Sequence, residues 1–287
     1  MKKILILLGI CMSLLVTGVL FYFKPNSNIT SNRTSYTNTI PKNEAIAVSA
    51  TANSYVQNNQ PLSSPKNPIS TKAVRINAID AEKLVTMVGS SENGVKYMSI
   101  EESGLPPDEI SNLKKDYDNL NKYGSYSGGE ITHEFTKAND FKEALRKNGN
   151  LENVKNKLNF TPTDVNSILG GNFKLMGADY SGSLSEGKFN SLFRYYEDGT
   201  GKRFEINEMY LTPANNYSLN VYKESINFDL VGHPATLQSL KNAENKEIYN
   251  LDFNVNRRVF SISSEGFNYS EFLQTSMAIA HAAEKEI

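Results

Sequence analysis

Three histidines are the side chains best suited to acid–base or metal chemistry near neutral pH, and they lie far apart in the sequence. His133, His233 and His281 form no HxH or HxxxH pair, and Cys11 is the single cysteine, so the spacing predicts neither a zinc site nor a disulfide. His233 stands between a glycine and a proline, which both favour turns. We therefore expect His233 to be a corner residue at a strand end rather than a catalytic base.

Nucleophilic chemistry has no recognisable motif in the chain. The glycine- and serine-rich stretches around Ser127 and Ser181 lack the G-x-S-x-G pattern, and no Walker loop, G-x-G-x-x-G, HExxH or EF-hand loop occurs. Pairs of carboxylates run glycoside hydrolysis, but with 31 acidic residues and no tryptophan the sequence singles out no such pair. We predict no catalytic residue, no cofactor and no metal, and a secreted hydrolase with an unrecognised site remains an alternative.

The charge balance argues against a polyanionic partner. The 287 residues include 30 Lys and Arg and 31 Asp and Glu, which gives a net charge of -1. Binding to a phosphate backbone needs an excess of positive charge. We therefore expect no nucleic acid among the partners.

The first 24 residues indicate a membrane. Lys2 and Lys3 precede an uncharged apolar run from Ile4 to Phe23. At about 1.5 Å per residue this run spans about 30 Å, the thickness of a bilayer core. The sequence predicts a single-pass anchor at 1–24 with the remaining chain outside the cytoplasmic membrane, or a secreted protein if the segment is a signal cleaved near Gly18. The Ser-, Thr-, Asn- and Pro-rich residues 25–71 predict a disordered linker.

Residues 72–150 predict a mixed, mostly helical subregion. Its clearest helix begins at two prolines, repeats apolar residues at three- and four-residue steps and ends at Gly124. The stretch 128–137 is typical of a short strand, and 140–149 of a short helix.

Residues 151–287 predict an antiparallel sheet followed by a C-terminal helix. Leucine and valine recur at helical spacing just after residue 151, and from Gly171 onward the apolar period changes to two. The stretch 197–202 supplies the glycines of a tight hairpin, and a helix begins near Asn268. The predicted fold class is α+β, with an antiparallel sheet that has one face covered by helices.

This order of elements resembles the bacterial extracytoplasmic domain of unknown function 4367 over about residues 151–284. The resemblance rests on packing positions, which are Phe160, Pro162, Phe173, Leu175, Gly232, Ala235, Phe260, Ile262, Ile279 and Ala280. It implies a half-barrel-like sheet similar to that of lipoprotein carriers. It also implies a binding or sensing module outside the membrane, of the kind found in anti-sigma or sporulation proteins, without an active site.

Three functions follow from these expectations. The first is a membrane-tethered, non-catalytic binding or sensing module of the bacterial envelope, with an envelope protein as a possible partner in stress response or sporulation. The second is a carrier of a lipid-like or other hydrophobic ligand, and the third is the secreted hydrolase. The side chains expected to face a ligand are Phe189, Phe193, Phe228, Phe253 and His233.

Overall fold

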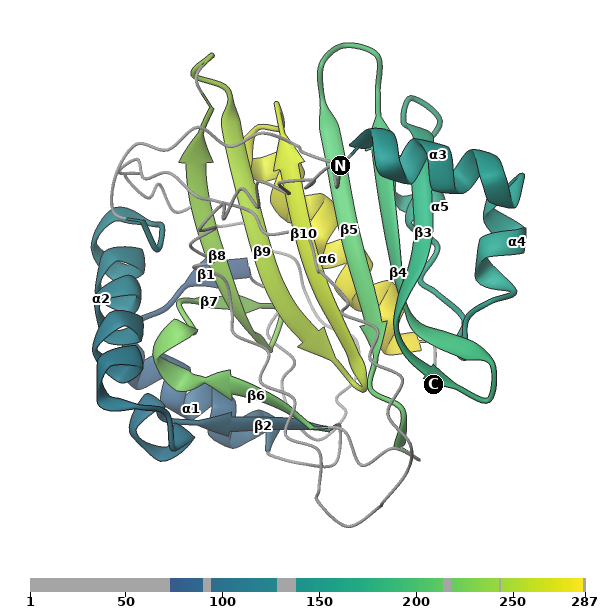
Figure 1. Ribbon diagram of the computed structural model, residues 1–287. Coiled ribbons are helices and arrows are strands. Elements are labelled where there is room, and N and C mark those ends of the chain that lie inside the picture. The colour runs from purple at the N-terminus through teal and green to yellow at the C-terminus, as the bar shows by residue number, and fades with distance from the viewer. Residues whose placement is uncertain (1–72, 90–93, 128–137, 214–217, 243, 286–287) are drawn as a thin grey trace, which may run out of the picture.

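The structure is a computed structural model (Figure 1). It describes residues 73–89, 94–127, 138–213, 218–242 and 244–285. The predicted anchor and linker, residues 1–71, and the predicted strand at 128–137 with His133 lie outside the described residues. Within the ranges that are described, no helix is long and apolar enough to cross a membrane.

The centre of the fold is one open, eight-stranded antiparallel sheet, which confirms the predicted α+β class. A separate parallel pair consists of β2 (Val95–Met98) and β6 (Leu219–Tyr222). In their order across the large sheet, the strands are β1 (Ala73–Arg75), β7 (Phe228–Leu230), β8 (His233–Lys241), β9 (Glu247–Val255), β10 (Arg258–Glu265), β5 (Arg203–Tyr210), β4 (Lys188–Glu197) and β3 (Lys174–Ser185).

The two faces of the sheet differ because side chains alternate along each strand. In β10, Phe260 and Ile262 point to one face and are buried with the rest of the main core, whereas Ser261 and Ser263 point to the other. We call these the apolar face and the polar face. Each fully buried Phe or Ile side chain contributes about 1.5–3 kcal/mol to folding, so the apolar face is the main source of stability.

Helix α6 (Tyr269–Lys285) covers the apolar face, as predicted, and lies behind the strands in Figure 1. Its first turn is capped by Asn268, whose side-chain oxygen accepts a hydrogen bond of 2.9 Å from the backbone N–H of Glu271. Phe272 and Ile279 are fully buried against the sheet.

The sequence-based prediction placed helices on one face only, but the structure also places helices against the polar face. Helix α3 (Ala138–Asn148) packs on β3 and β4, where Phe141 stacks on Phe193 with ring centroids 3.7 Å apart. Helix α1 (Ala78–Val88), β2 and β6 pack around Val259, near the hairpin that joins β9 and β10. Side-chain alternation within single strands does not reveal such packing, because it depends on contacts between distant segments.

The structure contains the helix predicted to end at Gly124 and the hairpin predicted at 197–202. The predicted helix ending at Gly124 is α2, and Gly124 has the left-handed backbone conformation typical of a helix end, with φ 80°. Glu197 and Arg203 flank the predicted hairpin between β4 and β5. The remaining bounds are α2 (Pro107–Tyr123), α4 (Leu151–Lys155), α5 (Val165–Leu169) and the 3₁₀ turns Ile100–Ser103 and Lys223–Ser225.

Candidate functional site: the polar face of the sheet

His233 lies at the corner that the sequence predicts. It is the first residue of β8 and pairs with Leu230 across a two-residue turn. Its Nε2 lies 2.9 Å from Glu284 Oε1, and the second oxygen of Glu284 lies 3.0 Å from His281 Nδ1. The two histidines and Glu284 therefore join the β7–β8 turn to the end of α6, and both imidazoles belong to this structural contact.

The four phenylalanines expected to face a ligand do not lie together. Phe228 and Phe253 are buried in the packed core of the apolar face, where Phe253 stacks on Phe260. Phe189 packs on Tyr180 near the sheet edge, and Phe193 lies on the polar face beneath α3. These positions do not outline a common apolar binding site.

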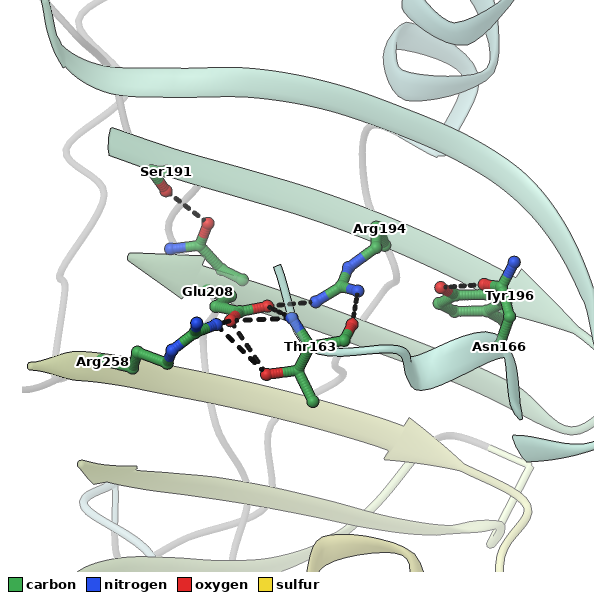
Figure 2. A network of polar contacts seen from close by, with 8 residues as sticks. Thr163, Asn166, Ser191, Arg194, Tyr196, Glu208 and Arg258 are labelled. Carbon is green, nitrogen blue, oxygen red and sulfur yellow. Dashed lines mark hydrogen bonds and ion pairs between the residues drawn. The ribbon is translucent and has the colours of Figure 1, made fainter. Parts of the chain in front are cut away.

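A buried ion-pair network lies on the apolar face (Figure 2). Glu208 has no exposed surface, and its oxygens lie 2.6 Å from Arg194 Nη2 and 2.5 Å from Arg258 Nη1. The backbone N–H of Thr163 donates to both oxygens of Glu208 at 3.1 Å, and its hydroxyl donates to Oε1 at 3.0 Å. Arg194 Nη1 donates to the Thr163 carbonyl.

This network attaches the segment before α5 to the sheet. Glu208 comes from β5, Arg194 from β4 and Arg258 from β10, while Thr163 belongs to the segment before α5. The carboxylate is enclosed by donors from β4, from β10 and from the segment before α5, so a ligand would have to displace protein contacts to reach it. We assign the network a structural role.

A different arrangement occupies the polar face above β9, β10, β5 and β4. Three serine hydroxyls there donate to a side-chain oxygen of an Asn or Asp on the neighbouring strand. The pairs are Ser261 with Asp252 at 2.6 Å, Ser263 with Asn250 at 2.7 Å, and Ser191 with Asn207 at 2.9 Å. Each bond fixes the orientation of the Asx side chain, so the polar groups are held in place before any ligand arrives.

Glu205 completes this face and has no hydrogen bond or ion pair within the described part of the chain. It lies opposite Ser263 in the register of β5 and β10, and its exposed fraction is 7%. Burial raises the pKa of Glu205 to about 8; the positive charge of Arg203 offsets part of this effect, and the negative charge of Glu265 adds to it. A buried carboxylate without a partner is costly, which makes Glu205 unusual in this fold.

Asp252 is the second carboxylate of the polar face. It lies opposite Ser261 on β10 and opposite Thr236 on β8. Burial raises its pKa to about 6, and the hydrogen bond from Ser261 offsets part of that rise. Both carboxyls thus titrate closer to neutral pH than is usual for their type.

Packed elements border the polar face on two sides. On one side, Tyr97 donates to Asn254 at 2.9 Å, and the backbone N–H of Tyr126 donates to Gln238 at 3.3 Å. On the other side, α3 covers Phe193. In Figure 1, which views the sheet from its polar face, α2 and α3 stand on opposite sides of β9, β10 and β5.

The polar face offers hydrogen-bonding groups rather than a metal site. Across the described ranges, no group of three or more His, Cys, Asp or Glu side chains is arranged to hold a metal ion. The available groups are amides, hydroxyls and two carboxyls, which suit a ligand with several polar atoms. The sequence contained an unrecognised signal for this face in the stretch "YNLDFNV", where the positions opposite the core are the short polar side chains Asn250, Asp252 and Asn254.

The fold and this face define an α+β protein with an open antiparallel sheet, one apolar face under α6, and one polar face that carries paired hydrogen-bonding side chains. Comparison with known proteins gives no significant match to a family model, to a curated protein or to a solved structure.

Proposed function

We propose that this protein is a membrane-tethered, non-catalytic binding module of the bacterial envelope and that the polar face of its sheet holds the ligand. The observation that carries the proposal is Glu205, a carboxyl more than nine-tenths buried that no described side chain pairs. A group that costs stability and has no partner among the described residues suits a partner outside the chain.

The polar pairs around Glu205 support a binding role. A solvated sheet face usually carries long, flexible charged side chains. This face instead carries serines bonded to Asn207, Asn250 and Asp252, and the exposed fraction of Ser191, Ser263 and Asn250 is 9% or less. Ordering polar groups in advance reduces the entropy cost of binding. The four phenylalanines named from the sequence lie in separate places, which favours a polar ligand over a lipid.

The location outside the membrane is part of the proposal and rests on the apolar run at 4–23. The resemblance of residues 151–284 to domain of unknown function 4367 supports the same location, and membership of that family is also part of the proposal.

Two measurements on one full-length, C-terminally tagged chain test the proposal. Spheroplasts are treated with protease, and we expect the tag to be degraded without lysis. The chain is then solubilised in detergent and incubated with isolated envelope material, and we expect Glu205→Gln combined with Asn207→Ala to reduce its retention. Protection of the tag in intact spheroplasts, or retention unchanged by the two substitutions, would overturn it.

A further inference from the structure

The chemistry of the polar face restricts the class of ligand, on the premise that the proposed function is correct. Two of the three serine–Asx pairs use the side-chain oxygens of Asn207 and Asn250 as acceptors. Their amide nitrogens donate no hydrogen bond to any described residue. These two amides therefore keep donors that no described residue uses, at positions fixed by the strand register, and such donors suit a ligand with many hydroxyl or carbonyl oxygens.

The same face carries two carboxyl groups at its centre. Glu205 and Asp252 lie on either side of β10, opposite Ser263 and Ser261 respectively. Within the described residues, neither carboxyl has an ion pair, and the nearby Arg203 lies 3.9 Å from Glu265. Burial favours the protonated form of Glu205, and a cation on the ligand would favour its ionised form and supply the counter-charge.

We infer that the polar face binds an oligosaccharide that carries free amino groups, an amino-sugar glycan. Its hydroxyls match the amide donors and serine hydroxyls, and its ammonium groups match Glu205 and Asp252. Lipid tails do not match the polar face, because this part of the face has polar side chains.

The test measures binding of the full-length chain in detergent micelles to three probes. These are a chitosan hexasaccharide with free amines, a chitin hexasaccharide with acetylated amines, and hexalysine. We expect the chitosan probe to bind at least tenfold more tightly than either of the others. Chitin bound as tightly as chitosan would overturn the inference, because the free amine would then contribute nothing. Hexalysine bound as tightly would also overturn it, because positive charge without a sugar would then suffice.

Variants connect the binding to the face. Glu205→Gln keeps the shape of the side chain and should weaken chitosan binding at least tenfold, and Asn207→Ala should weaken it through the lost amide donor. Glu109→Gln, an exposed change on α2, is the matched control and should bind like the wild type. Melting curves confirm that each variant is folded, and undiminished binding by folded Glu205→Gln and Asn207→Ala would overturn the inference.

The two proposals fail in different ways. If no glycan binds but the Glu205 and Asn207 substitutions still reduce retention on envelope material, the ligand class is wrong and the binding surface stands. If the substitutions leave retention unchanged, the binding surface itself is wrong.

Discussion

Each face of the sheet contains a buried glutamate, but only one of the two is paired with other described residues. On the apolar face, Glu208 is surrounded by Arg194, Arg258 and Thr163. On the polar face, Glu205 is buried without a partner in the described part of the chain. The first arrangement stabilises the fold, and the second is retained at a cost in stability that we attribute to ligand binding.

Replacing Glu208 should destabilise the protein strongly. Glu208→Gln removes the carboxylate that both guanidinium groups share, and breaking a buried pair of this kind costs about 3–5 kcal/mol. Chemical denaturation in urea measures the free energy of unfolding. Asp80→Asn, which breaks an exposed pair with Lys83, is the control and should change stability little. Equal stability of the two variants would contradict the structural role of the network.

The raised pKa of Glu205 predicts how stability depends on pH. Since the folded protein holds this proton up to about pH 8 and the unfolded chain releases it near the usual value of 4.5, the unfolded state binds fewer protons between these values. The contribution of Glu205 to stability therefore falls as pH rises through this window, and Asp252 acts in the same direction up to about pH 6.

Thermal unfolding at a series of pH values checks this. The wild type should lose stability from about pH 5 to about pH 8, and Glu205→Gln should remove much of that loss because glutamine does not titrate. Parallel curves for wild type and variant would show that Glu205 titrates normally.

At the scale of elements, the packing of α3 on the polar face depends on one close approach. A Cβ at Gly177 in β3 would lie 2.7 Å from the carbonyl carbon of Phe141 and 2.8 Å from the nitrogen of Lys142, and both are backbone atoms of α3. Gly177→Ala should therefore push α3 off the sheet and cost about 1–3 kcal/mol. Gly171→Ala is the matched control, since nothing lies within 4 Å of its added Cβ.

Protease sensitivity detects the movement of α3. Limited proteolysis followed by mass spectrometry should show faster cleavage within 138–148 for Gly177→Ala than for Gly171→Ala. Identical cleavage patterns, together with identical stability, would mean that α3 is not held as the structure describes.

The elements themselves were largely predictable, and the site was not. Alternation in β10 and helical spacing in α6 predict each element and its buried side, because these patterns are local. The contact of Phe141 with Phe193 and the positions of Glu205 and Asp252 beside β10 depend on strand order and on packing between distant segments. Charges at core-facing positions, such as Arg194 between Leu192 and Tyr196, were a usable signal for the buried network.

At the scale of the whole molecule, the proposed tether and the folded part should be separable. Deleting residues 1–24 should move the protein from the membrane fraction to the soluble fraction, because the apolar run is lost. Its melting temperature should stay unchanged, since the described fold begins at Ala73. Cell fractionation with circular dichroism checks both, and a full-length chain in the soluble cytosolic fraction would contradict the proposed anchor.

Site-specific photo-crosslinking in living cells tests the binding surface most directly. A photoreactive amino acid replaces Met209, which lies two residues after Asn207 on the same face of β5, or Glu109 on α2 in the full-length chain. We predict an adduct with envelope material after irradiation for position 209 and none for position 109. Adducts at 109 with none at 209, in chains that melt like the wild type, would contradict the account.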